Sequence, residues 1–322
     1  MTDAFPPTAP RPERLELRLR QAALIAALAM VGYLGLALLG DAAVFLEGLQ
    51  RLSLVQWLAL LGLSLLNYGL RFARWHFYLR ALEARVPLGR HLTIYLAGFA
   101  FTVSPGKAGE AVRSIYLRGA GVPWSRGLAA LAVERVLDLA VMVILAALAL
   151  QAFADYAGSA VLAVLLVAGL LFLVTRPGVS RWLLGRLPAT GRWATVGRGT
   201  TALLDDSRVL LAPGRLLGGL LLGLLAWGAE AWGFYWLLEW LDVGLDPLLA
   251  MGIYAASMVA GALSFLPGGL GGAEAAMVAL LLAGGAVLGT AVLATVICRA
   301  VTLWFAVVLG LGAVLLLGRR GS

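Results

Sequence analysis

Charged side chains that lie inside long apolar runs are the first residues of this chain that could do chemistry. A charge at the centre of a membrane helix costs about 2.5–3.5 kcal/mol, so each is expected to face a partner or water. A planar guanidinium can hold a phosphate through two parallel hydrogen bonds. Arg135 and Arg299 are therefore predicted to bind an anion. The charged residues inside apolar runs are Glu110, Arg113, Glu134, Arg135, Asp138, Glu230, Glu274 and Arg299.

Several of these residues also have a purely structural explanation. Glu134 and Asp138 are four residues apart and Arg135 and Asp138 are three apart, so ion pairs within one helix could simply lock helices together. Glu110 and Glu274 follow Pro-Gly breaks, where a carboxylate either caps a new helix or handles protons or substrate. The sequence leaves both alternatives open.

Three further charged residues are secondary candidates. Arg71 and Arg74 precede Trp75, Phe77 and Tyr78, and an aromatic belt with arginines reaching to the membrane surface explains that pattern. The alternative is that these two arginines gather anionic lipid headgroups. The third secondary candidate is Glu230, which lies inside a predicted span.

Two Pro-Gly breaks interrupt the apolar runs and are expected to position these charges. They are SPGKAGE at 104–110 and PGGLGGAE at 267–274. Proline cannot continue a helix, and glycine admits the backbone angles of a reversal. Free N–H groups at the start of the helix after each break favour an anion, so both breaks are predicted to bind substrate. The residues assigned to them are Pro105, Gly106, Gly109, Glu110, Arg113, Pro267, Gly268, Gly269, Gly271 and Glu274.

The composition predicts an all-α polytopic membrane protein. Of the 322 residues, 61% are hydrophobic and 13% are charged, which is too apolar for a soluble domain. Apolar runs predict six spanning helices, together with broken segments at 92–118 and 248–283 that are re-entrant hairpins, or two more crossings if they span. The six predicted spans cover 22–40, 54–70, 127–153, 158–175, 216–240 and 288–317.

The two halves of the chain have the same predicted order of elements. Arg135 lies 30 residues after Pro105, and Arg299 lies 32 residues after Pro267. Each half has two spans, a broken segment and a third span, and the second half starts on the opposite side of the membrane. This pattern predicts an inverted-topology repeat. The predicted division is a tail at 1–21, a first unit at 22–152, an outside turn at 153–157, a second unit at 158–317 that includes segment 176–215, and a tail at 318–322.

The distribution of positive charge predicts the orientation. Apart from Arg51, Arg135 and Arg299, the 25 Lys and Arg residues lie in the N-terminal tail, in 71–91, 107–126 and 176–215, or at the C-terminus. Because cytoplasmic segments are enriched in Lys and Arg, both termini are expected in the cytoplasm of a multi-pass plasma-membrane protein. Segment 176–215 is expected to hold interfacial helices over 180–187 and 195–211.

Catalytic and cofactor motifs are missing from the sequence. It has no P-loop, no GxSxG and no HExxH pattern, and the net charge of +8 follows topology rather than indicating nucleic acid. Cys298 is the single cysteine, so the chain can form no internal disulfide or thiolate metal site. We therefore expect no enzyme activity, no cofactor, no metal and no nucleic-acid partner. The sequence does not indicate an oligomeric state.

Four motifs resemble the membrane region of the lysylphosphatidylglycerol synthase family. They are RFARWHFYLRAL (71–82), SPGKAGEAVR (104–113), VERVLD (133–138) and SFLPGGLGGAEAA (264–276). This region is also found in stand-alone, flippase-like proteins, and in full-length synthases it is thought to flip the aminoacylated lipid. Only four residues follow Gly318, so the resemblance implies lipid translocation without the aminoacyl transfer that a separate soluble domain performs. It does not imply the same substrate.

The functional expectation is a flippase that moves a phosphate-bearing lipid, either a phospholipid or a polyprenyl-phosphate-linked lipid, between leaflets. Its partner would be a membrane lipid with an anionic headgroup. One alternative is a membrane glycosyltransferase that uses a lipid-linked sugar, for which Asp41 and Glu47 are the acidic candidates in the first outside loop. The other alternative is a secondary transporter of a small molecule.

Overall fold

The computed structural model describes residues 47–48, 50–104, 108–150, 158, 169, 191–264 and 266–319. Within these ranges every regular element is a helix and none is a strand, so the all-α prediction is confirmed. Apart from Gly158 and Gly169, the predicted spans at 22–40 and 158–175 lie outside the described residues, as does 180–187. The number of spans therefore stays a prediction.

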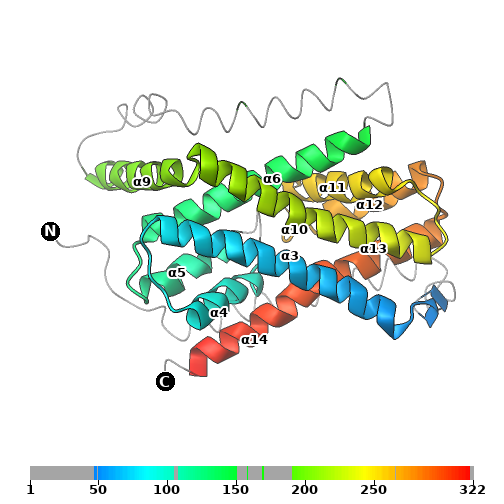
Figure 1. Ribbon diagram of the computed structural model, residues 1–322, viewed down its shortest axis with the longest axis horizontal. Coiled ribbons are helices and arrows are strands. Elements are labelled where there is room, and N and C mark those ends of the chain that lie inside the picture. The colour runs from blue at the N-terminus through cyan, green and yellow to red at the C-terminus, as the bar shows by residue number, and fades with distance from the viewer. Residues whose placement is uncertain are drawn as a thin grey trace.

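The described helices form two sets in chain order (Figure 1). The first set is α3 (Leu54–Ala81), α4 (Leu88–Phe99), the 3-10 turn η1 (Ala108–Ala111), α5 (Val112–Arg118) and α6 (Trp124–Leu150). The second is α9 (Gly191–Leu210), α10 (Pro213–Trp240), α11 (Pro247–Leu263), α12 (Gly272–Ala283), α13 (Leu288–Arg299), the π-helical turn η3 (Ala300–Trp304) and α14 (Phe305–Arg319).

Local sequence signals account for where several helices begin. Ser53 accepts a hydrogen bond from the N–H of Gln56, whose side chain accepts one from the N–H of Ser53, and this capping box starts α3. Asp246 caps α11 through the N–H groups of Leu248 and Leu249. Proline is tolerated in the first turn of a helix, and α10 and α11 both begin with one.

Helix α3 is longer than predicted. The expected span ended at Leu70, but the helix runs for 28 residues to Ala81 and carries Arg71 and Arg74 into the protein interior. At about 1.5 Å per residue it is roughly 42 Å long. The prediction was wrong because two arginines normally mark a membrane surface, whereas here carboxylates of α6 neutralise both.

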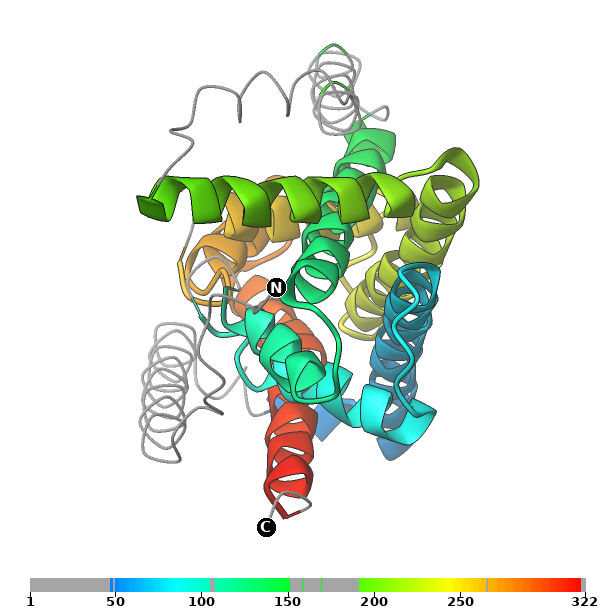
Figure 2. The same cartoon turned by 90° about the vertical axis from the view of Figure 1, so that its left-hand side faces the viewer.

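The two sets of helices pack against each other reciprocally (Figures 1 and 2). Helix α6 of the first set lies along α11 of the second, and α14 of the second lies along α4 of the first. Helices α3 and α10 pack together and run in opposite directions. Such reciprocal packing is what a two-fold relation between inverted units would produce. The unit boundaries themselves stay a prediction.

The two broken segments meet where their helices stop. Helix α4 ends at Phe99 and η1 begins at Ala108, while α11 ends at Leu263 and α12 begins at Gly272. The N–H of Gly268 donates to the carbonyl oxygen of Ser104 across 3.3 Å. Two main-chain reversals that are far apart in sequence are thus hydrogen-bonded to each other.

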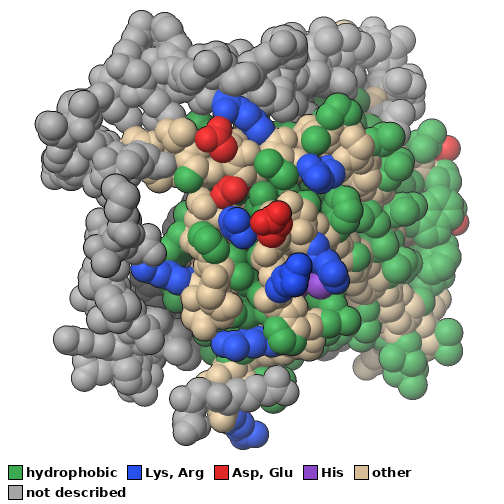
Figure 3. Space-filling model, turned by 60° about the vertical axis from the view of Figure 1, so that its left-hand side comes forward, with side chains coloured by type: hydrophobic (Ala, Val, Ile, Leu, Met, Phe, Trp, Pro, Cys, Tyr) green, Lys and Arg blue, Asp and Glu red, His purple; other side chains and the backbone are tan. Residues whose placement is uncertain are grey.

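The surface of the molecule separates charge from apolar area. In Figure 3, charged side chains gather near the middle of the face toward the viewer, and hydrophobic side chains cover the right-hand part of the view. Exposed leucines run along the outer faces of α3, α10 and α14, as expected for helices that face lipid. Two helical stretches, Pro213–Trp240 and Leu288–Arg319, are long and apolar enough to cross a membrane.

Helices α3 and α6 are similar in length to Pro213–Trp240, but they bury charged side chains and are therefore less apolar than that helix. Helix α9 is a polar 20-residue helix across one side of the bundle (Figure 2), and it confirms the helix predicted over 195–211.

Candidate functional site

A cavity of about 260 Å³ lies where α6, α10 and α11 meet the second break. Its charged lining consists of Arg135 and Asp138 from α6 and Arg299 from α13. The backbone of Gly268 and Gly269 forms part of the wall, and the remaining lining is largely apolar. The two arginines that the sequence placed in equivalent positions therefore line one space, although their role in binding stays a prediction.

Arg135 sits where three carboxylates converge. Its Nη2 lies 2.9 Å from Glu134, 3.2 Å from Asp138 and 3.6 Å from Glu110. Its side chain is 26% exposed, whereas those three carboxylates are buried. The contact with Glu110 joins α6 to the first broken segment, so Arg135 is not paired only within its own helix.

The same three carboxylates also hold three buried arginines, and the seven residues form what we call the ion network. It consists of Arg71, Arg74, Arg113, Arg135, Glu110, Glu134 and Asp138. Four guanidinium groups against three carboxylates leave the network with one excess positive charge. Arg135 is its most exposed cation, so this excess is presented to the cavity.

Arg71 and Arg74 belong to this network, so the predicted belt of surface arginines is wrong. Arg74 is fully buried and its Nη2 lies 2.5 Å from Oδ1 of Asp138, while Arg71 lies 3.1 Å from Glu134. A buried guanidinium is tolerated only when paired and hydrogen-bonded, and these partners meet that need. Neither arginine is at a surface where it could gather lipid headgroups.

Arg113 is buried against aromatic rings as well as carboxylates. It lies 3.0 Å from Glu110 and 3.2 Å from Glu134, and its guanidinium carbon lies 4.1 Å from the centre of the Tyr95 ring. Arg113 is not among the described residues that line the cavity. It therefore supports the carboxylates that hold Arg135.

Arg299 binds the second break directly. Its Nε donates to Glu274 across 2.7 Å, and its Nη2 donates to the carbonyl oxygen of Gly268 across 3.1 Å. The other oxygen of Glu274 accepts from the N–H of Gly271 at 2.6 Å and so caps α12. The capping alternative considered for Glu274 is therefore present, and the same carboxylate also orients Arg299.

The glycines of the two breaks are needed for different reasons, either a positive φ or close packing. Gly268, Gly269 and Gly271 have φ values of 64°, 69° and 84°, which side chains other than glycine rarely adopt. A Cβ added to Gly109 would lie 2.7 Å from the carbonyl oxygen of Phe101, so this glycine is needed for close packing. Pro105 and Gly106 lie outside the described residues, and Pro267 is half-buried beside Gly268.

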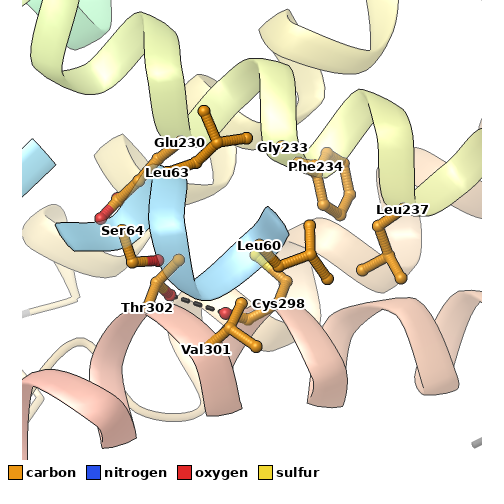
Figure 4. A pocket seen from close by; sticks show the side chains of 10 residues that line it. All are labelled: Leu60, Leu63, Ser64, Glu230, Gly233, Phe234, Leu237, Cys298, Val301 and Thr302. Carbon is orange, nitrogen blue, oxygen red and sulfur yellow. Dashed lines mark hydrogen bonds between the residues drawn. The ribbon is translucent and has the colours of Figure 1, made fainter. Parts of the chain in front are cut away.

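Glu230 lies apart from the cavity, beside a void of about 10 Å³ between α3, α10 and α13 (Figure 4). Such a void holds about one water molecule. The hydroxyl of Tyr254 donates to Glu230 across 2.5 Å, and Ser64 lines the same void. At its floor the hydroxyl of Thr302 donates to the carbonyl oxygen of Cys298 across 2.7 Å (Figure 4). The structure does not bring Glu230 together with Arg135.

Trp227 and Met258 line the cavity but were not predicted from the sequence. Inside an apolar run a tryptophan or methionine looks like any lipid-facing side chain, so no local signal identifies them. The pairing of Trp227 with Asp138, through its Nε1–H at 3.0 Å, appears only in the tertiary structure. Of the two acids considered for a glycosyltransferase, Glu47 pairs with exposed Arg51 and Asp41 lies outside the described residues.

A family model described as the lysylphosphatidylglycerol synthase TM region matches residues 22–310, which include both broken segments and all charged residues of the cavity. No curated protein matches the chain. The family is a membrane domain, which agrees with the apolar helices, and it indicates a lipid-related function in the membrane. The chain belongs to the family of lysylphosphatidylglycerol synthase transmembrane regions.

Proposed function

We propose that this protein is a flippase that moves a phosphate-bearing lipid between the leaflets of the plasma membrane, without covalent catalysis. The phosphate would enter the central cavity and bind Arg135 and Arg299, while the hydrocarbon tails stay in the bilayer. The partner is thus a membrane lipid with an anionic headgroup. Family membership supports the lipid-related part of this proposal.

The observation that carries the proposal is the shared cavity. Arg135 and Arg299 come from opposite halves of the chain, yet both line one space of about 260 Å³ beside the contact between the two breaks. Guanidinium groups bind phosphate through charge-assisted hydrogen bonds. A transporter with inverted repeats places its substrate site at the interface of the repeats, often at broken helices.

The breaks are proposed as the gate of this site. Gly268 contributes its carbonyl oxygen to Arg299 and its N–H to Ser104, so it touches both the cavity and the other break. A movement of this turn would change the position of Arg299 and the contact between the breaks at the same time. The glycines allow the backbone angles that such a movement needs.

Leaflet exchange of a labelled phosphate lipid in proteoliposomes tests the proposal. Wild-type protein is expected to move the lipid faster than empty liposomes do, and Arg135→Gln is expected to lower the rate by about tenfold or more, the equivalent of ~1.4 kcal/mol. This variant removes the exposed cation but leaves three arginines for three carboxylates. Arg299→Lys is expected to keep part of the activity, because lysine keeps the charge and loses the planar fork.

The matched control is Arg51→Gln, which removes an exposed arginine that pairs with Glu47 and Asp242; none of the three is among the described residues that line the cavity. It should move lipid at the wild-type rate. If wild-type protein moves none of a panel of glycerophospholipids and polyprenyl phosphates, the flippase assignment is wrong. If Arg135→Gln moves lipid as fast as Arg51→Gln does, transport does not pass through this cavity.

A further inference from the structure

The carboxylate of the cavity, which would bind an ammonium ion most strongly, already has donors on both oxygens. Among the described lining residues, Asp138 is the only carboxylate. Its Oδ1 receives Arg74 at 2.5 Å and the Nε1–H of Trp227 at 3.0 Å. Its Oδ2 receives Arg71 at 3.3 Å and Arg135 at 3.2 Å. Both oxygens of the carboxylate are therefore engaged.

The face of the Trp227 ring and two nearby carbonyl oxygens also have partners. The Trp227 ring, which could bind a cation on its face, has the guanidinium carbon of Arg71 4.8 Å from its centre. The carbonyl oxygen of Gly268 accepts from Arg299 at 3.1 Å. The carbonyl oxygen of Gly261 accepts from the Ser264 hydroxyl at 2.7 Å. At Asp138 an entering ammonium would have to displace a guanidinium or the indole N–H, and at the two carbonyl oxygens it would have to share an acceptor that already has a donor.

The net positive charge of the cavity also disfavours an ammonium ion. Arg135 presents the excess positive charge of the ion network, and Arg299, whose charge is balanced by Glu274 at 2.7 Å, adds a second guanidinium to the lining. A phosphate meets both cations. A headgroup that also carries an amine brings a like charge against them, and like-charge contacts across an interface are unfavourable.

We infer that the cavity selects phosphate headgroups that carry no amine, and that Arg71 enforces this selection from behind the cavity wall. The inference rests on the proposed function and names the substrate class for it. Phosphatidate, phosphatidylglycerol and polyprenyl phosphate share the accepted chemistry. Phosphatidylethanolamine and lysylphosphatidylglycerol carry amines and are rejected.

Arg71 is a positioning residue because it does not line the cavity itself. It contacts both the Asp138 carboxylate and the Trp227 ring, which are the two strongest sites for an amine in the wall. Arg71→Gln frees the ring and one contact of Oδ2. It leaves three arginines facing three carboxylates, so the network also loses its excess positive charge, which acts in the same direction as freeing these two sites.

The test is binding of dihexanoyl lipids of one chain length to purified full-length protein, measured by the shift of its thermal transition over a lipid titration. Wild-type protein is expected to bind dihexanoyl phosphatidylglycerol at least about tenfold tighter than dihexanoyl phosphatidylethanolamine. A lysylphosphatidylglycerol of the same chain length should bind weakest. Arg71→Gln should narrow the preference, chiefly by gaining affinity for the ethanolamine lipid, whereas Arg51→Gln should keep the wild-type ratio.

Equal affinity of wild-type protein for the glycerol and ethanolamine lipids, or no binding of either, overturns the inference. An unchanged ratio in folded Arg71→Gln overturns the role of Arg71. If this variant does not fold, the wild-type comparison still decides whether amines are rejected. Leaflet exchange is measured separately. Transport of both lipids at equal rates would contradict the inferred selectivity and leave the proposed flippase function standing. Selective binding without transport would contradict only the flippase function.

Discussion

At the scale of single residues, Glu134 is the centre of the ion network. It is fully buried and lies 2.9 Å from Arg135, 3.1 Å from Arg71 and 3.2 Å from Arg113. The Tyr95 hydroxyl donates to the same carboxylate across 3.2 Å. One acid therefore neutralises guanidinium groups from three different helices, α3, α5 and α6. Its removal leaves several buried cations without their common partner.

Glu134→Gln should consequently destabilise the protein more than Arg135→Gln does. The glutamine leaves four arginines against two carboxylates, whereas loss of Arg135 leaves three against three. Breaking a buried ion pair by removing one partner costs about 3–5 kcal/mol, and the unbalanced variant should reach that range. Thermal unfolding in the same detergent measures the difference. Equal transition temperatures for the two variants would contradict the proposed excess of positive charge.

At the scale of elements, the second break depends on main-chain geometry that only glycine provides easily. A Cβ added to Gly269 would lie 3.0 Å from the carbonyl oxygen of Gly261 in α11, and the residue has a positive φ of 69°. The turn therefore packs directly on the helix it follows. The neighbouring carbonyl, that of Gly268, is the one that binds Arg299.

Gly269→Ala is expected to lower the thermal transition temperature, because its Cβ meets backbone at a disfavoured φ. Gly228→Ala is the matched comparison in the middle of α10, where nothing lies within 4 Å of the added Cβ. Alanine stabilises a helix interior by about 0.5–1 kcal/mol relative to glycine, so this change should be neutral or stabilising. A loss of stability at Gly228→Ala as large as that at Gly269→Ala would refute the packing argument.

At the scale of the whole molecule, loops predicted to share one side of the membrane lie together. Arg51, before α3, lies 3.7 Å from Asp242, after α10. The loop after α3 lies at the opposite end of the bundle in Figure 1. Three cations that were counted toward cytoplasmic segments, Arg71, Arg74 and Arg113, are buried in the ion network instead. The charge bias therefore rests on the remaining ones, such as exposed Arg85.

Cysteine labelling of intact cells tests the orientation. Asp242→Cys is expected to react with a membrane-impermeant maleimide, and Arg85→Cys is expected to react only after the cells are opened. Native Cys298 is buried, so background labelling should be low. Labelling of position 85 from outside would reverse the predicted topology and put the termini on the other side of the membrane.

Local sequence patterns determined the fold class and the two breaks, and they predicted that Arg135 and Arg299 hold equivalent positions. Apolar runs, Pro-Gly pairs and isolated intramembrane charges each act on their own stretch of chain, so they can be found without knowing which helices touch. The spacing of Pro105 to Arg135 and of Pro267 to Arg299 is likewise a property of the sequence. These features predicted where the cavity would have charge.

Only the tertiary structure decided which charges are buried and which face the cavity. Arg71 and Asp138 are 67 positions apart, and Arg299 and Gly268 are 31 apart, so no local pattern pairs them. Arg71 and Arg74 look like a membrane boundary until α6 supplies their carboxylates. The energy of a buried charge depends on the partners that packing brings within hydrogen-bond distance, and a sequence does not specify those partners one stretch at a time.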